Sequence, residues 1–233
     1  MRVVNHQEKR IGATLADALQ PHAAELSRFA ERGRPYLSTA ASDVWDDVFP
    51  LVLPPDREHG LGIILLNSNS DSHFSFTNAL GVVSAAQAKA IDIVFAQYPL
   101  SCWLIGLHHH PVEYPRAAKV LSERVGTTLV NGNWFLRRLR PMAKRCVLMH
   151  GHRHIDWIGE CGGLVIVSAP SPIMEATNDL DTYFYIHTLE VGGDGCLRLL
   201  APQRIDVPGD RPSQNGPVDL AEDNGLAERR AGR

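Results

Sequence analysis

Long apolar runs, paired cysteines and an excess of one charge are all missing from this 233-residue chain. No run approaches the roughly 20 apolar residues that span a bilayer, and the opening sequence MRVVNHQEKR lacks the apolar stretch of a secretory signal. The 23 Lys and Arg against 26 Asp and Glu give a net charge of -3, which provides no global attraction to nucleic acid or to an anionic membrane. We therefore expect a cytoplasmic protein that does not bind membranes.

Several common functional motifs are also missing. Cys102, Cys146, Cys161 and Cys196 lie far apart and form no C-x-x-C pair, so we expect reduced cysteines rather than a disulfide framework. The sequence has no Gly-rich loop of the P-loop or dinucleotide type and no G-x-S-x-G motif. These absences argue against a nucleotide-binding loop of either kind and against a serine hydrolase of the nucleophile-elbow type.

The patterning predicts an α/β fold. The 44% hydrophobic and 21% charged fractions are typical of a globular protein. Apolar runs of strand length alternate with amphipathic stretches, which favours strands separated by helices. The predicted strands of this part cover 60–67, 101–111 and 145–154, and the predicted helices cover 86–98, 116–126 and 134–144.

The rest of the chain divides around this core. Helical periodicity over 12–34 predicts a surface helix or a helix pair, because Pro21 can interrupt or restart the helix. Stretches 164–171, 182–191 and 196–207 have period-two character, and they predict an antiparallel sheet. We therefore divide the chain into a helical or irregular segment 1–59, an α/β core 60–207 and a disordered polar tail 208–233.

Two histidine-rich segments carry the clearest functional signal. The sequences HHH at 108–110 and HGHRH at 150–154 each end a predicted strand. Functional groups in open α/β sheets gather at the carboxyl ends of strands, so the fold can bring the two segments face to face. Gly151 permits a tight turn in which the rings of His152 and His154 converge. Neutral imidazoles suit transition metals, and a purely polar network is the alternative interpretation.

These motifs also resemble a known family. GLHHHP at 106–111 followed by MHGHRH at 149–154 resembles the last two metal-binding motifs of the calcineurin-like metallophosphoesterases, which include purple acid phosphatases and cyclic-nucleotide phosphodiesterases. The stretch 65–91 resembles the family's central passage. The likeness covers residues 60–201 and implies a layered mixed sheet with flanking helices, a four-layer sandwich that lacks part of its N-terminal half.

The resemblance also implies a site and a reaction. By position in the motifs, His109, His152 and His154 would ligate metal, while His108 and His110 would lie behind the ligands or face the substrate. The family holds two divalent transition metals (Mn, Fe or Zn) and hydrolyses phosphomonoesters or phosphodiesters with a metal-activated water. It implies a phosphorylated small molecule or a nucleotide as substrate. No protein nucleophile is needed, so no catalytic side chain is assigned.

The family's earlier ligand motifs, D-x-H, G-D and G-N-H-D/E, have no counterpart here. Asn5-His6 lacks the preceding Gly, and Asp71-Ser72-His73 follows its strand in a stretch that we interpret as a solvated loop. We hypothesise that the chain is part of a longer protein, which predicts an uncovered sheet edge or face near residues 60–66 and 101–107. Three imidazoles without carboxylates could hold one cation rather than two, with weak or absent catalysis.

Two other functions stay open. One is a mononuclear tris-His zinc hydrolase that acts on a non-phosphate bond, and the other is a non-catalytic binding module that retains the fold. A basic run is interpreted as a solvated helix face, with a phosphate-binding patch as the alternative. This run consists of Arg137, Arg138, Arg140, Lys144 and Arg145.

Overall fold

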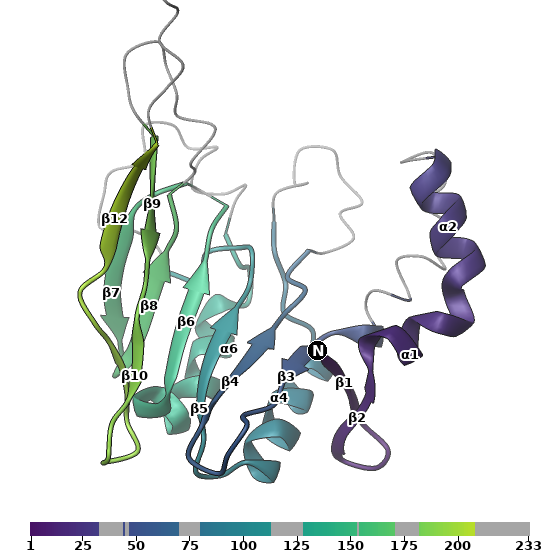
Figure 1. Ribbon diagram of the computed structural model, residues 1–233, viewed down its shortest axis with the longest axis horizontal. Helices are drawn as coiled ribbons and strands as arrows, with labels where there is room; N and C mark the ends of the chain where they lie inside the picture. The colour runs from purple at the N-terminus through teal and green to yellow at the C-terminus, as the bar shows by residue number, and fades with distance from the viewer. Residues whose placement is uncertain are drawn as a thin grey trace, which may run out of the picture.

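The centre of the molecule is one eight-stranded mixed sheet, shown in Figure 1. The computed structural model describes residues 1–32, 44, 47–69, 80–112, 128–152, 154–170 and 182–207. In spatial order the strands are β2 (Arg10–Thr14), β1 (Arg2–Asn5), β3 (Leu51–Leu53), β4 (Leu61–Leu65), β5 (Cys102–Gly106), β6 (Cys146–His150), β8 (Leu164–Ser168) and β7 (Trp157–Cys161). Strands β4, β5, β6 and β8 run parallel, and the others pair antiparallel with their neighbours. The predicted mixed α/β sheet is confirmed.

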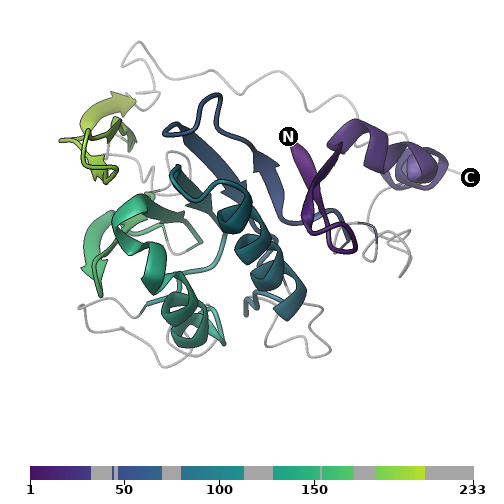
Figure 2. The same cartoon turned by 90° about the horizontal axis from the view of Figure 1, so that it is seen from below.

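Helices cover one face of this sheet. Figure 2 shows α4 (Ala85–Gln97) and α6 (Gly132–Leu139) side by side on that face. The 3-10 helix η4 (Arg140–Arg145) continues from α6 and leads into β6. Three further elements lie beyond the edge of the sheet formed by β2 (Figure 1). They are α1 (Leu15–Leu19), the 3-10 turn η1 (Gln20–His22) and α2 (Ala23–Arg32). Within the described ranges, no helix combines the length and apolar character needed to cross a bilayer.

The helix-covered face holds the main core. Trp103 of β5 is fully buried there, and it packs in one cluster with Ile64 of β4, Ile91 of α4 and Phe135 of α6. Burying each such side chain stabilises the fold by about 2 kcal/mol. A side chain at Gly62 would place its Cβ 2.3 Å from the Trp103 ring, so only glycine fits beside the indole. This packing fixes β4 and β5 in register.

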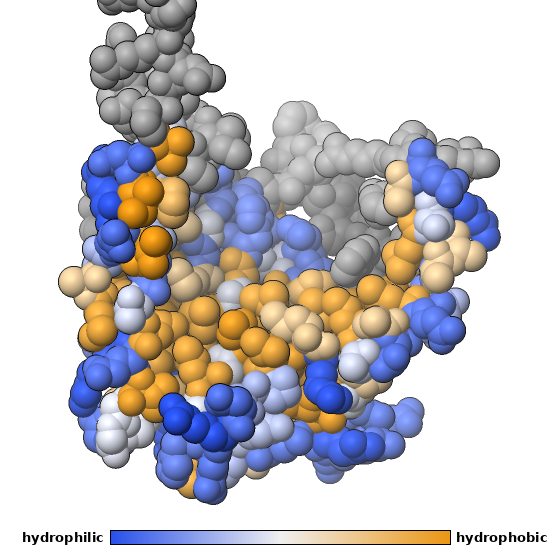
Figure 3. Space-filling model, in the orientation of Figure 1, coloured by the Kyte–Doolittle hydropathy of each residue, from blue (hydrophilic) through white to orange (hydrophobic). Residues whose placement is uncertain are grey.

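Two small sheets lie on the opposite face. Strands β10 (Leu189–Val191) and β11 (Leu197–Leu199) form one, and β9 (Thr182–Ile186) and β12 (Gln203–Val207) form the other. Leu197 packs with Val147 and Val167 of the main sheet in a second cluster. Figure 3 shows a broad apolar surface on this side of the molecule. The described residues thus form three layers of the expected four: helices, main sheet and small sheets.

Local signals account for several elements. Ser84 caps α4, because its Oγ accepts a hydrogen bond from the backbone N–H of Gln87 at 3.2 Å. The predicted strands at 60–67, 101–111 and 145–154 are confirmed as the shorter strands β4, β5 and β6, of which the last two end at Gly106 and His150, and the helix over 86–98 is confirmed as α4.

The helical stretch 12–34 is confirmed as a helix pair, α1 and α2, which η1 with Pro21 separates, although β2 extends to Thr14. Two details of the prediction were wrong. Stretch 164–168 was expected in the antiparallel sheet, but as β8 it pairs parallel with β6. Its residues are largely buried, as in a strand covered on both faces. Strand β7, which pairs with β8, was not predicted.

The edge beside residues 60–66, one of the two forms expected for the uncovered region, is covered, so that form is wrong. The other form was an uncovered face, and the side chains of β4 that point away from the helices are partly exposed. Strand β3 pairs antiparallel with β4 there, and β1 and β2 extend the sheet further. These strands have only three to five residues, too few to show a clear period in the sequence. The hypothesis of a longer parent chain gains no support from this edge, and the division at residue 59 stays a prediction.

Some expectations concern residues outside those the structure describes. They are the helix over 116–126, the Asp71-Ser72-His73 loop and the tail 208–233.

Candidate metal centre

The two histidine segments lie side by side at the carboxyl ends of β5 and β6. Gly106 and Met149 are paired in the parallel ladder, and hydrogen bonding continues past both strands. The N–H of Leu107 donates to the Met149 carbonyl at 3.1 Å, and the N–H of Gly151 donates to the His108 carbonyl at 3.1 Å. The extended ladder therefore fixes the backbone from which the rings project.

Three imidazoles meet at this point. The ring centroid of His152 lies 4.6 Å from that of His108 and 4.7 Å from that of His109, and the rings of His108 and His109 are 5.0 Å apart. One nitrogen from each ring lies within 4.8 Å of the other two. The structure thus brings together the two segments, as the strand-end argument predicts.

A hydrogen bond joins two of the rings. Nε2 of His108 and Nδ1 of His152 are 2.7 Å apart. Burial lowers the pKa of His108, and the charge of His154 lowers it further. A lowered pKa keeps the ring of His108 neutral, the form that binds metal ions.

The turn that presents these rings has an unusual backbone. His152 and His154 have φ angles of 70° and 53°, in the left-handed region that costs a residue with a side chain roughly 1–2 kcal/mol. Gly151 is not in this region, although the sequence suggested that it would allow the turn. Backbone strain of this kind is often stored at functional sites.

A second pair of histidines lies deeper. His110 and His150 are buried, and their ring centroids are 6.5 Å apart. Burial lowers the pKa of His150 to about 4. Neither residue belongs to the three-ring group, so His110 and His150 form a separate, buried pair.

Not every predicted ligand lies in the group. His109 and His152 do, whereas His154 does not, and His108 takes the third place. His154 is still close enough for its charge to act on His108. Which three of these four imidazoles hold a metal stays a prediction. Ser68 and Gly81, which also contact His109, were not singled out in the sequence. Ser68 follows the carboxyl end of β4, and that position was the available signal.

The donor set fits a single transition-metal ion. A tetrahedral zinc site with Zn–N distances of about 2.0–2.1 Å places its nitrogens roughly 3.3 Å apart. The ligand atoms of His108, His109 and His152 lie within 4.8 Å of one another, so the rings would need to adjust around an ion. Three neutral imidazoles suit zinc and leave a fourth position open. The group contains no carboxylate from the described parts of the chain. These three imidazoles by themselves supply no anionic oxygen to bridge a pair of dications.

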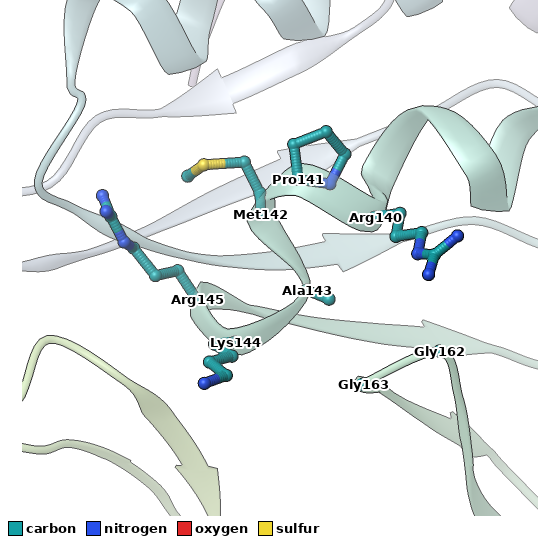
Figure 4. Close-up of a pocket in the computed structure, with 8 residues that line it drawn as sticks. All are labelled: Arg140, Pro141, Met142, Ala143, Lys144, Arg145, Gly162 and Gly163. Atoms are coloured by element: carbon teal, nitrogen blue, oxygen red, sulfur yellow. The ribbon is translucent and has the colours of Figure 1, made fainter.

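A cavity lies at the amino ends of the parallel strands, at the end of the sheet away from the histidines. This cavity, of about 340 Å³, is lined by η4 and by Gly162 and Gly163 of the β7–β8 turn. Figure 4 shows the side chains of Arg140 and Arg145 pointing in opposite directions. Two arginines near this surface are already paired within the protein: Arg138 forms an ion pair with Asp92, and Arg145 donates to the Pro99 carbonyl. The cations do not converge on one anion.

Comparisons with known proteins add little. No family model matches the chain, and no curated protein matches it. A structure of a candidate 5′-nucleotidase from Staphylococcus aureus in complex with alpha-ketoglutarate is 12% identical, with a TM-score of 0.39 over 76% of this chain. The chain spans 36% of the length of that protein. A single mutant of Vps29 from Entamoeba histolytica is 12% identical, with a TM-score of 0.18 over 63% of this chain and 99% of Vps29. Likenesses at this level carry no argument about this chain.

Proposed function

We propose that the protein binds one divalent transition metal at its histidine cluster and hydrolyses a phosphate ester there. The observation that carries the proposal is the meeting of His108, His109 and His152, whose ligand atoms lie within 4.8 Å of one another. The motif resemblance described above supports phosphate esters as the substrate class. A phosphorylated small molecule or a nucleotide is the proposed substrate.

The chain's own residues would hold and shield the metal. His109 and His152 supply two nitrogens in this proposal, and His108 or His154 supplies the third. A bound divalent ion would lower the pKa of a water molecule and polarise a phosphoryl oxygen. His109 is buried, whereas His108 is exposed, so the cluster is open to solvent on the side of His108. A substrate can reach the centre from that side.

The donor set also supports a second candidate. Among the described residues the group has no carboxylate, which is the arrangement of a mononuclear tris-His zinc centre. Such a centre could hydrolyse a carboxylic ester or an amide instead of a phosphate ester. The two candidates share the metal site and differ in the bond that is cleaved.

Metal binding is the first experiment. The purified chain, freed of metal with a chelator, is titrated with Zn²⁺, Mn²⁺ and Co²⁺ and then dialysed for elemental analysis. We expect one equivalent of bound metal, and a Co²⁺ absorption spectrum typical of tetrahedral nitrogen ligation. His59→Ala should bind the same one equivalent, because His59 is exposed and lies in the loop before β4, at the end of that strand away from the histidine cluster. Binding of no metal by the unaltered chain would refute the proposal.

Substrate profiling is the second experiment. The loaded protein is assayed with p-nitrophenyl phosphate, bis-p-nitrophenyl phosphate and p-nitrophenyl acetate under identical conditions. Turnover of the phosphate esters that disappears in His152→Gly supports the phosphoesterase. Turnover of the acetate alone supports the second candidate. Bound metal without turnover of any ester would instead indicate a binding module.

A further inference from the structure

Ser68 connects the end of β4 to the histidine segment that follows β5. Its side chain is 1% exposed. The Oγ accepts hydrogen bonds from the backbone N–H groups of His108 and His109, both at 3.2 Å, and lies 2.9 Å from Nδ1 of His109. One buried hydroxyl thus contacts the backbone and the ring of the same histidine.

Hydrogen bonds to the backbone of Asn67 and Ser68 hold Ser68 in position. The side-chain amide of Gln87, a buried residue of α4, accepts from the N–H of Asn67 at 2.9 Å and donates to the Asn67 carbonyl at 2.8 Å. The carbonyl of Ser68 accepts from the N–H of Val82 at 3.0 Å. The residue before Ser68 and its own backbone are therefore both hydrogen bonded, so the hydroxyl has little freedom to move away from His109.

The ring of His109 is confined on another side by Gly81. A Cβ built on Gly81 would lie 2.3 Å from Cγ of His109 and 2.5 Å from its Nδ1. The N–H of Gly81 donates to the Thr128 carbonyl, and the N–H of Val130 donates to the Gly81 carbonyl, so the glycine cannot easily retreat. Contact with Gly81 and the hydrogen bond to Ser68 together define one orientation of the imidazole.

We infer that Ser68 is a positioning residue that directs Nε2 of His109 toward the metal ion. The inference rests on the proposed function and adds a residue to it. A ring whose Nδ1 is held by Ser68 offers its Nε2 to a cation. The Oγ already accepts from two backbone N–H groups, so in the metal-free chain its O–H donates to Nδ1 and the ring proton lies on Nε2. Binding of a cation at Nε2 requires that proton to move to Nδ1, where the same oxygen can accept it. Partners of this kind typically change metal affinity 10–100-fold.

The test is the affinity of the full-length, metal-free chain for Zn²⁺, measured by competition with a chromophoric chelator. We expect Ser68→Ala to bind Zn²⁺ about 10–100-fold more weakly than the unaltered chain. Ser101→Ala is the matched control. Ser101 is equally buried and its Oγ donates to the Glu58 carbonyl at 2.6 Å, but it lies just before β5, at the amino end of the strand that His108 follows. We expect this control to change affinity less than twofold.

A second pair of variants separates the hydroxyl from the fold. Ser68→Thr and Ser68→Val have the same shape and differ only in the hydroxyl. We expect Thr to bind Zn²⁺ at least tenfold more tightly than Val. In the metal-free protein, ¹⁵N shifts of the His109 ring should report one dominant tautomer for the unaltered chain and a mixture for Ser68→Ala. Stability alone would not produce either difference.

The outcomes distinguish this inference from the proposed function. Failure of the unaltered chain to bind Zn²⁺ would overturn both. Tight binding by the unaltered chain with equal affinity in Ser68→Ala, or in Thr and Val, would overturn the positioning role and leave the metal site standing. If Ser68→Ala does not fold, the Thr and Val pair decides.

Discussion

The two ends of the parallel strands β4, β5, β6 and β8 differ in how their polar groups are arranged. At the carboxyl ends, Ser68, His109 and His110 are buried and the rings of neighbouring strands meet. At the amino ends lies the cavity lined by η4, where Arg140 and Lys144 are exposed and Arg140 points away from Arg145 (Figure 4). The amino ends have a cavity and exposed positive charges. At the carboxyl ends, ring nitrogens of His108, His109 and His152 come together.

This contrast shows that convergence and burial mark the candidate site better than empty volume does. Exposed cations interact weakly with ligands because water and salt screen them. Neutral imidazoles that are fixed by backbone ladders have already lost much of the freedom that metal binding would cost. On this interpretation the two ends differ in function as they do in structure.

The largest expected effect comes from replacing His152. His152→Gly removes a ring from the cluster and places glycine at a φ of 70°, a conformation that glycine adopts at no steric cost. We therefore expect more than 100-fold weaker Zn²⁺ binding together with unchanged or higher stability. The measurements are a chelator competition assay and urea denaturation of the metal-free chain.

Glycine at an exposed histidine outside the cluster is the control for His152→Gly. His59 lies at the amino end of β4, so His59→Gly should leave Zn²⁺ affinity unchanged. Equal affinities for His152→Gly and the unaltered chain would place the metal elsewhere and remove the functional contrast between the two ends.

The next largest effect is expected at Gly81. In Gly81→Ala the new Cβ would meet the His109 ring at 2.3–2.6 Å, so the ring must rotate or shift. We expect Zn²⁺ affinity to fall 10–100-fold even though no ligand atom is removed. Gly193→Ala is the control, because nothing lies within 4 Å of a Cβ at that position. If both alanines bind Zn²⁺ as the unaltered chain does, the ring of His109 is not confined as described.

The stability of the fold should also depend on pH through the buried ring of His150. The pKa of His150 is lowered from 6.5 to about 4 by burial, so between those values the unfolded chain takes up a proton that the folded chain excludes. The contribution of His150 to the free energy of unfolding is therefore fully present above pH 6.5 and is lost as the pH falls toward 4. The loss expected from His150 alone between pH 7 and pH 5 is about 2 kcal/mol.

Urea denaturation of the metal-free chain at the two pH values measures this loss. His150→Gln cannot take up the proton, so its stability should change by about 2 kcal/mol less over the same interval. A slope identical to that of the unaltered chain would show that His150 is not the residue responsible.

Much of the fold could be predicted because its parallel strands are strongly apolar. Strands β4, β5 and β6 are continuous apolar runs, and Ser84 gives a clear start to α4. Strands β1, β2 and β3 could not be predicted in the same way. Their few residues show mixed exposure, and they gain stability mainly from pairing with a sheet already present, which no local pattern records.

The site was predictable at the level of segments but not of individual rings. Strand-end placement brings the segment of His109 to that of His152, and this follows from topology. The third member of the group depends on the left-handed φ angles of His152 and His154, which no local sequence pattern indicates. Gln87 shows the same limit: its spacing from Ser84 suggests a capping box, yet its side chain bonds to Asn67, a residue far away in sequence.

The smallest effect is expected at the amino end of the strands. Arg140→Ala combined with Lys144→Ala removes two exposed cations beside the cavity, and we expect Zn²⁺ affinity and ester hydrolysis to change less than twofold. Hydrolysis of an anionic ester should fall slightly more at low salt, since the only remaining influence is long-range and screened within about 10 Å at 0.1 M ionic strength. A loss of phosphate-ester turnover that persists at high salt would mean that this end contacts the substrate. The contrast between the ends would then be a division between metal binding and substrate binding, rather than between a functional and a non-functional end.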